Sequence, residues 1–157
     1  MRLDGSNPRP LFQGSGQDID PTWSPDAQQV AFASAVTGDT LLYIANLENG
    51  KVYPVLREDM TIGGRSSWSP NGSWLAFYAG PRGDRDIYIV SPGGGALQQM
   101  TFGGDNLGPS FSPDSQWIAF TSYRDGNNEI YIMNINTLQA YRLTSTPASD
   151  WQPRWGP

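Results

Sequence analysis

The stretch Pro109-Ser110-Phe111-Ser112-Pro113-Asp114 decides the fold of this chain, because versions of it recur at a nearly constant interval. Earlier copies are Pro21-Thr22-Trp23-Ser24-Pro25-Asp26 and Ser66-Ser67-Trp68-Ser69-Pro70-Asn71, and a partial last copy is Pro153-Arg154-Trp155-Gly156-Pro157. The central aromatic residues of successive copies are 45, 43 and 44 residues apart. A repeat of roughly 40–45 residues with four strand-like segments is typical of a β-propeller blade. The sequence therefore predicts an all-β repeat protein.

The strands inside each repeat are predicted by their apolar pattern. In the second strand, Val30 and Phe32 share one face while Ala31 lies on the other, and the later repeats keep this order. The third strand is apolar on both faces, as in Leu42-Tyr43-Ile44. Such a strand has to be covered on both sides, which stacked blades achieve. We expect the alanine of the second strand to leave room for a bulkier neighbouring blade.

The composition narrows the functional class. The formal net charge is −5 and the ten Lys and Arg residues are scattered, so the chain lacks the basic patch typical of nucleic-acid binding. No stretch of 18 apolar residues occurs, and we expect no insertion into a membrane. The sequence has no Cys and no His, so it has no disulfide and no Ser-His-Asp triad. We expect no catalytic site and no cofactor, with a calcium ion in the central channel as the one alternative.

The repeats resemble the WD-repeat-like propeller unit of the TolB family. The third repeat matches this unit best, at 109–114, Ile118-Ala119-Phe120-Thr121-Ser122, Arg124-Asp125-Gly126-Asn127 and Glu129-Ile130-Tyr131-Ile132-Met133. The first repeat lacks the Arg-Asp-Gly loop, and the second has Gly63 and Ser66 where the family has an acid and a proline. The resemblance implies a propeller of six or more blades, a periplasmic or other extracytoplasmic setting, and a protein partner. It specifies the fold more closely than the function, since one fold serves many roles.

The repeat boundaries predict a single β-propeller segment of three complete four-stranded blades with a partial blade at each end. The boundaries are 1–17 for the tail of a preceding blade, 18–62, 63–105 and 106–149 for the three blades, and 150–157 for the first strand of a closing blade. Three blades do not close a ring, since closed propellers have at least four. The chain is expected to be a fragment of a six- to eight-bladed propeller or a half-ring that a homodimer closes, with a stable open monomer as a third alternative.

Candidate partner-binding residues precede the first strand of each repeat, near the channel mouth of related propellers. They are Asp18, Asp20, Arg65, Asp105, Asn106, Asp150 and Trp151. A ring of acids at this place suits a basic partner surface, or a cation such as calcium in the central channel. The alternative for Asp18, Asn106 and Asp150, each three residues before a proline, is that they cap turns through side-chain hydrogen bonds. The alternative interpretation of Arg65 is a solvated loop residue, and that of Trp151 is packing at the edge of a blade.

We therefore expect a non-enzymatic interaction scaffold that binds a protein partner, or a small ligand, at the channel mouth. One alternative is a propeller domain that gates or positions a separate hydrolase or peptidase. Another is the sensor domain of a larger regulator. The alternatives differ in what accompanies the propeller: a catalytic α/β domain, a DNA-binding module, or neither.

Overall fold

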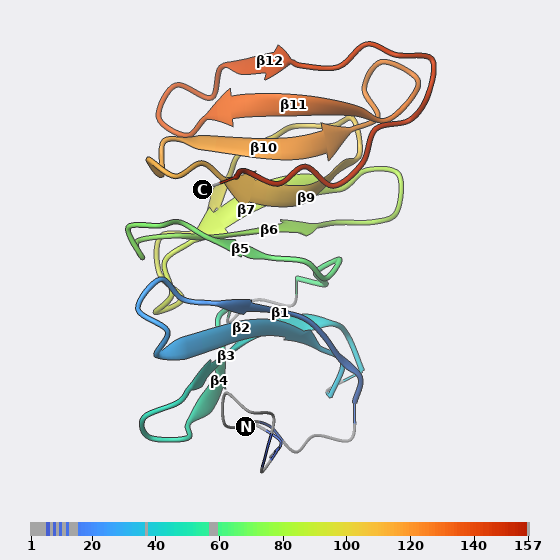
Figure 1. The fold of residues 1–157 in the computed structure, drawn as a ribbon. Helices are drawn as coiled ribbons and strands as arrows, with labels where there is room; N and C mark the ends of the chain where they lie inside the picture. Colours follow the sequence, from blue (N-terminus) through green and yellow to red (C-terminus); the bar gives the residue numbers. More distant parts are fainter. Residues whose placement is uncertain are drawn as a thin grey trace.

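The computed structural model describes residues 6, 8, 10, 12, 16–36, 38–56 and 60–156. The regular secondary structure of these residues consists of β-strands alone. The strands form three four-stranded antiparallel sheets (Figure 1). None of the described residues forms a helix long and apolar enough to cross a membrane. The prediction of an all-β partial propeller is confirmed, and each sheet is one blade.

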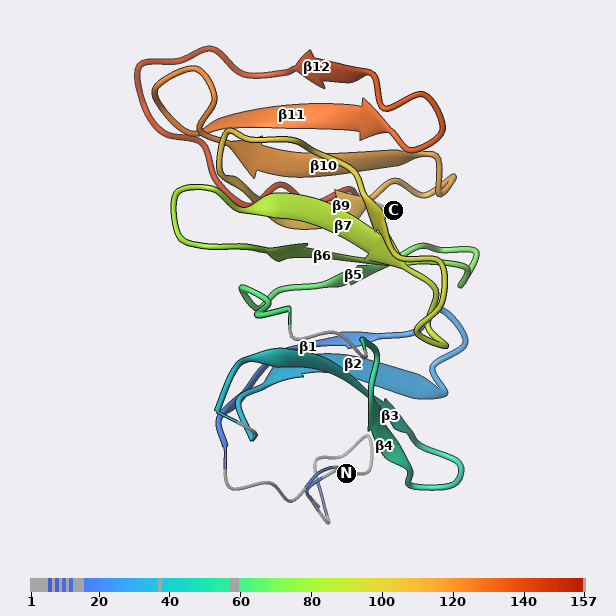
Figure 2. The same cartoon turned by 180° about the vertical axis from the view of Figure 1, so that it is seen from behind.

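The strands of each sheet follow one another in sequence order. The first sheet contains β1 (Asp18–Trp23), β2 (Gln29–Ser34), β3 (Leu41–Asn46) and β4 (Val52–Pro54). The second contains β5 (Ser67–Trp68), β6 (Leu75–Ala79), β7 (Asp86–Val90) and β8 (Gln98–Gln99). The third contains β9 (Asn106–Phe111), β10 (Trp117–Ser122), β11 (Glu129–Asn134) and β12 (Ala140–Arg142). The view from behind in Figure 2 shows the same stack of three sheets.

The apolar cores lie between successive sheets. Ala31 and Ile44 of the first sheet pack in one buried cluster with Leu75 and Phe77 of the second. The second core repeats this arrangement, with Ala76, Ile87 and Ile89 of the second sheet against Ile118 and Phe120 of the third. The small residues Ala31 of β2 and Ala76 of β6 therefore face the large residues of the next sheet, as the sequence predicted. Close packing of this kind is what orders the blades into a stack.

Two sheet faces lie outside these cores. On the first sheet, the buried Phe32 and Tyr43 stack on each other and pack against Phe12, with ring centroids 5.7–5.9 Å apart. On the third sheet, Ile130 and Ile132 are only half-buried, whereas the equivalent residues of the second sheet are buried. The predicted tail of a preceding blade, 1–17, falls mostly outside the described residues.

Each inner strand joins the preceding sheet through a repeated backbone hydrogen bond. The amide N–H of Ile62 donates to the carbonyl of Thr40 at 2.9 Å, and that of Asn106 donates to Arg85 at 2.7 Å. The amide of Asp150 donates to Asn128 in the same way, also at 2.7 Å. The segment that follows β12 thus docks on the third sheet as β9 docks on the second, and Figure 1 shows it running beside β9.

Candidate functional site at the mouth

The end of the sheets at which β1 and β9 begin is named the mouth, and it contains all seven predicted site residues. Three equivalent positions there have left-handed backbone: Asp20 with φ 53°, Gly108 with φ 57° and Gln152 with φ 54°. The strand register shifts at the first two, between Ile19 and Thr22 and between Leu107 and Ser110, which marks β-bulges. Only glycine adopts this conformation without strain, so Asp20 and Gln152 are held there by their surroundings.

Asp20 and Arg65 are brought together across two repeats. The Oδ2 atom of Asp20 accepts a hydrogen bond of 3.0 Å from the backbone N–H of Arg65. The Nη1 atom of Arg65 donates a bond of 2.8 Å to Oε1 of Gln152. Asp20 and Arg65 also line one polar hollow of about 250 Å³, together with Pro21, Thr22, Ser66 and Arg154. Side chains from two repeats and from the segment after the third therefore meet at one place.

Asp105 lies apart from that hollow and holds two loops together. Its carboxylate forms a two-pronged ion pair with Arg85, with Nε–Oδ1 at 2.7 Å and Nη2–Oδ2 at 2.6 Å. The hydrogen bonds of this pair lower the pKa of the Asp105 carboxyl and raise the pKa of Arg85. Such planar, charge-assisted pairing fixes geometry, so this contact fastens the β6–β7 loop to the start of β9.

Asn106 is buried between the second and third sheets. Its Nδ2 donates to Oδ1 of Asp86 at 3.0 Å and to the carbonyl of Gly103 at 2.8 Å, while its Oδ1 accepts from Nη2 of Arg124 at 3.1 Å. Both ends of the amide are therefore occupied by other groups of the chain. This arrangement positions loops at the mouth and leaves little of Asn106 for a partner.

The remaining predicted residues lie on the outside of the mouth. Asp18 begins β1 opposite Ser34 and is exposed. Asp150 accepts a hydrogen bond from the hydroxyl of Thr146 at 3.3 Å. Trp151 next to it is 55% exposed. Exposed aromatic side chains beside charged ones are common at protein interfaces.

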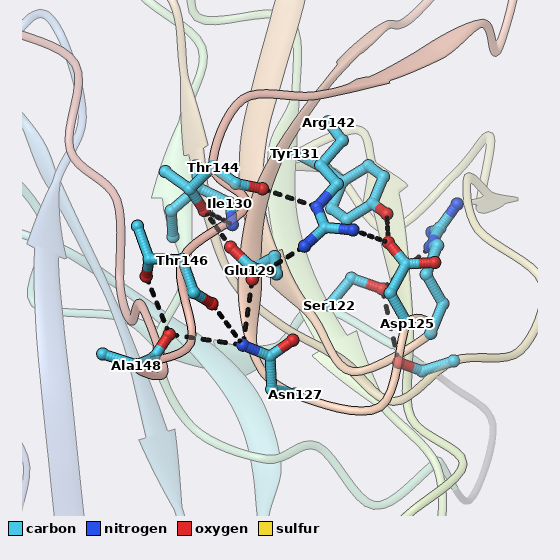
Figure 3. Close-up of polar contacts among 12 residues, drawn as sticks. Ser122, Asp125, Asn127, Glu129, Ile130, Tyr131, Arg142, Thr144, Thr146 and Ala148 are labelled. Carbon is cyan, nitrogen blue, oxygen red and sulfur yellow. Dashed lines mark hydrogen bonds and ion pairs between the residues drawn. The ribbon is translucent and has the colours of Figure 1, made fainter.

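A buried carboxylate in the third sheet positions the segment that carries Asp150 and Trp151 (Figure 3). Glu129 is fully buried, and its Oε1 accepts bonds from Arg142 at 2.8 Å and Asn127 at 2.9 Å. Its Oε2 accepts the hydroxyl proton of Thr144 at 2.5 Å. Asn127 also donates to the carbonyl oxygens of Thr146 and Ala148 at 3.0 and 3.3 Å. One buried acid thus ties the returning chain to the β10–β11 loop.

The second sheet repeats this buried acid. Asp86 accepts the hydroxyl proton of Thr101 at 2.8 Å, as Glu129 does from Thr144. Each threonine oxygen also accepts the amide proton of the residue after the acid, at 2.9 Å in both sheets. In the first sheet the equivalent positions carry Leu41 and Leu56 and contain no such pair. The acid–threonine pair therefore joins strands within the second and third blades. It was not identified from the sequence.

Solved structures with this arrangement of blades include TolB proteins. TolB from Acinetobacter baumannii superposes with a TM-score of 0.83 and 26% identity, over 97% of this chain and 38% of that chain. A putative TolB from Agrobacterium tumefaciens superposes with a TM-score of 0.75 and 21% identity, over 94% and 69%. The Tol-Pal system protein TolB of Hamiltonella defensa is 35% identical over 52 residues, which is 33% of this chain and 12% of that protein.

The repeats of this chain are TolB-like propeller repeats. No family model matches the chain. This chain matches only 38% of the A. baumannii protein and 12% of the H. defensa protein. Enzymes share the fold at lower identity, among them a prolyl endopeptidase with a TM-score of 0.63 and 13% identity.

The mouth of the TolB-like repeats differs in charge from the predicted ring of acids. Among the described residues, no group of three or more Asp, Glu, His or Cys side chains is placed to hold a metal ion. The suggested calcium ion therefore has no such ligand set there. What the TolB-like fold gathers in the hollow is two arginines, Arg65 and Arg154, with the single acid Asp20.

Arg154, Ser66 and Gln152 were missed by sequence reasoning. Each lies within three residues of a repeat anchor, Trp68 or Trp155, in a stretch whose repeat pattern was clear. The signal available was the place of Arg154 directly before Trp155, where the earlier repeats have Thr22, Ser67 and Ser110. The earlier repeats have small hydroxyl residues at this inner-strand position. A long charged side chain there is therefore a sequence signal for a residue that lines the channel.

Proposed function

We propose that this TolB-like propeller segment is a non-enzymatic scaffold that binds a protein partner at the mouth. The observation that carries the proposal is the meeting of Asp20, Arg65 and Gln152, which come from different repeats. Two of them have left-handed backbone that costs free energy. Strain of this kind is typical of functional sites.

The surface around these residues supports protein binding. Trp151 and Asp18 are exposed at the mouth, where Arg65 is half-buried. Tryptophan and arginine are enriched among residues that dominate interface energies. One relative is named for the Tol-Pal system, so proteins of that system are the first partners to test.

A catalytic role has less support. The sequence has no His and no Cys, which removes the usual general base and the usual thiol nucleophile from this chain. The enzymes that share the fold do so at identities that show the fold alone. The alternative of a propeller that gates a hydrolase places the chemistry in a separate domain.

Site-specific crosslinking tests the proposal. A photoreactive amino acid replaces Trp151 at the mouth in one variant and Trp23 in another. Trp23 is 59% exposed at the opposite end of β1, so it is a matched control. We expect a partner to crosslink at position 151 and not at 23. Equal crosslinking at both positions, or crosslinking at 23 alone, contradicts the proposal.

We further propose that a second copy of the chain packs against the two outer sheet faces. The Phe32–Tyr43 face of the first sheet, on which Phe12 of the same chain already packs, corresponds to the Phe77–Tyr88 face, which the preceding sheet covers. The half-buried Ile132 on the third sheet corresponds to Ile89, which the next sheet covers. The two outer faces thus correspond to the two halves of an interface that the fold already makes twice. Light scattering after size exclusion, over a tenfold concentration range, is expected to give the dimer mass; a constant monomer mass contradicts it.

A further inference from the structure

The polar hollow at the mouth holds more positive than negative charge. It is lined by the side chains of Arg65 and Arg154 and by one acid, Asp20. The hydrogen bonds of these groups leave the imbalance in place. The Arg65 guanidinium donates to a neutral amide oxygen, that of Gln152, and the Asp20 carboxylate accepts from a backbone N–H. Two cations therefore face a single anion.

Arg154 has the least compensated charge of the three. Within the described part of the chain it forms no hydrogen bond and no ion pair. Partial burial, together with the nearby positive charge of Arg65, lowers the pKa of the Arg154 guanidinium, and the charge of Asp20 opposes this only in part. An anion placed in the hollow would remove the repulsion between the two guanidinium groups.

Ser66 supplies a second, independent sign of a ligand. It lines the hollow, its residue is 3% exposed, and its hydroxyl oxygen has no hydrogen-bond partner among the described residues. Buried hydroxyl groups are nearly always paired in native proteins, and an unpaired one calls for a missing water, ion or ligand. Pro21 and Pro109 occupy the same place in the first and third repeats, so this hydroxyl is particular to the second.

We propose that this hollow binds a side-chain carboxylate of an acidic peptide segment, with Arg65 and Arg154 as its two anchors. The inference rests on the proposed partner-binding function and names the chemistry that the partner presents. Guanidinium groups match the planar carboxylate and bind it through paired hydrogen bonds. Ser66 lines the same hollow, and its buried hydroxyl has no hydrogen-bond partner among the described residues.

The size and the wider charge of the chain favour this ligand. The hollow measures about 250 Å³, whereas sites for whole small molecules span roughly 300–1,000 Å³. A group the size of one side chain fits it better than a complete cofactor. The chain as a whole carries a formal charge of −5, so general attraction does not draw an acidic peptide to it. Binding therefore has to come from the local arginine pair.

The test is a titration of the intact chain with an acetylated, amidated tetra-aspartate peptide. Binding is measured by calorimetry and by changes in the side-chain Nε–Hε NMR signals of arginine. The tetra-asparagine peptide is the neutral control, and inorganic phosphate at equal ionic strength is a second arm. We expect the tetra-aspartate peptide to bind and to shift the signals of Arg65 and Arg154, but not that of Arg82. Arg82 is exposed on the β6–β7 loop and outside the hollow.

Matched variants locate the site. Arg65→Gln and Arg154→Gln are each expected to weaken peptide binding about tenfold, because each removes a charge-assisted contact. Arg82→Gln removes the same charge elsewhere and is expected to leave the affinity within twofold. Arg65→Lys and Arg154→Lys keep the charge and lose the planar fork, so they are expected to bind with intermediate affinity. If a glutamine variant fails to fold, the lysine variants and the NMR shifts of the unaltered chain still decide the question.

Three results would overturn the inference. They are no binding of the tetra-aspartate peptide, equal loss of affinity in Arg82→Gln, and binding of phosphate without binding of the peptide. The broader function fails separately. If a partner crosslinks at position 151 and the Arg65→Gln/Arg154→Gln variant still captures it with unchanged affinity, the scaffold function holds and the carboxylate site is wrong. If the peptide binds at the arginines but no partner crosslinks at the mouth, the anion site holds and the scaffold function is wrong.

Discussion

Arg65 and Gln152 are 87 residues apart in the sequence and are joined by a 2.8 Å hydrogen bond between Nη1 and Oε1. This bond connects the loop before β5 to the segment after the third sheet, across the first residues of β9. Gly108, at the equivalent position of the third repeat, approaches Gln152 closely, and a side-chain Cβ built there would lie 3.9 Å from Cα of Gln152. The mouth is therefore a place where three repeats approach each other closely.

Replacing Gln152 by glutamate tests the charge balance at this contact. Gln152→Glu places a carboxylate where Arg65 now meets a neutral amide, so Arg65 gains an internal counter-ion. We expect the affinity for the tetra-aspartate peptide to fall several-fold, measured by calorimetry at low ionic strength, since charged hydrogen bonds contribute about 1.5–3 kcal/mol. Gln139→Glu, on the exposed β11–β12 turn, adds the same charge away from the hollow and is the control. An equal effect of the two changes would show that overall charge, not Arg65, sets the affinity.

Gly63 is required by a close approach to Tyr78. A Cβ atom at position 63 would lie 1.8 Å from Cε2 of the Tyr78 ring, whose hydroxyl donates to the Gly63 carbonyl. We expect Gly63→Ala to lower the free energy of unfolding by about 1–3 kcal/mol, because the ring has to move. Gly93→Ala, with open space around it, is the control and is expected to change it little. Urea denaturation measures the free energy of unfolding of both variants. The loss caused by Gly63→Ala should be smaller in a chain that also carries Tyr78→Ala.

Glu129 should make stability depend on pH. Hydrogen bonds from Thr144, Asn127 and Arg142 lower the pKa of this carboxyl below its ordinary value of 4.5. The folded state therefore favours the charged form, and the stabilisation is complete above pH 4.5 and is lost as the pH falls through the lowered pKa. We expect Glu129→Gln to lower the melting temperature at pH 7, and the difference from the unaltered chain to shrink as the pH falls below 4.5.

The control for this experiment is Glu48→Gln, which changes an exposed carboxyl on the β3–β4 turn. Thermal unfolding followed by circular dichroism from pH 3 to 7 is the measurement. A Glu129→Gln difference that is the same at pH 3 and pH 7 would mean that shape, not charge, matters at this position.

Replacing the equivalent residues Ile89 and Ile132 by alanine should lower the free energy of unfolding by different amounts. Ile89 is 2% exposed between the second and third sheets, whereas Ile132 is half-buried on the open face of the third. We expect Ile89→Ala to lower the free energy of unfolding by about 2–5 kcal/mol and Ile132→Ala by less than about 2 kcal/mol in dilute solution. If a second copy covers that face, Ile132→Ala should also weaken the dimer in light scattering. Equal costs in the dilute monomer would contradict the assignment of an open face.

The repeat spacing was enough to predict the sheets because each blade is built from local signals. The Ser-Pro turns, the Ala-Phe order of the second strands and the doubly apolar third strands lie within one repeat and depend on neighbours in sequence. The anchor spacing was less informative at the start of the second repeat. Counting back from Trp68 puts Gly63 in the place of Asp18, whereas the bridge to Ala79 is made by Ile62, because this repeat holds one more residue before its anchor.

The sequence by itself determined the all-β class, the three blades and their apolar interfaces, since alternation and turn chemistry act over a few residues. Only the tertiary structure decided which polar groups meet at the mouth. Asp105 and Asn106 are occupied by Arg85, Asp86 and Arg124, while Arg154, absent from the predicted site, shares a hollow with Arg65. The reason is physical: side chains far apart in the sequence meet only after the blades stack, and the bulges near Asp20 and Gly108 bend the strands β1 and β9.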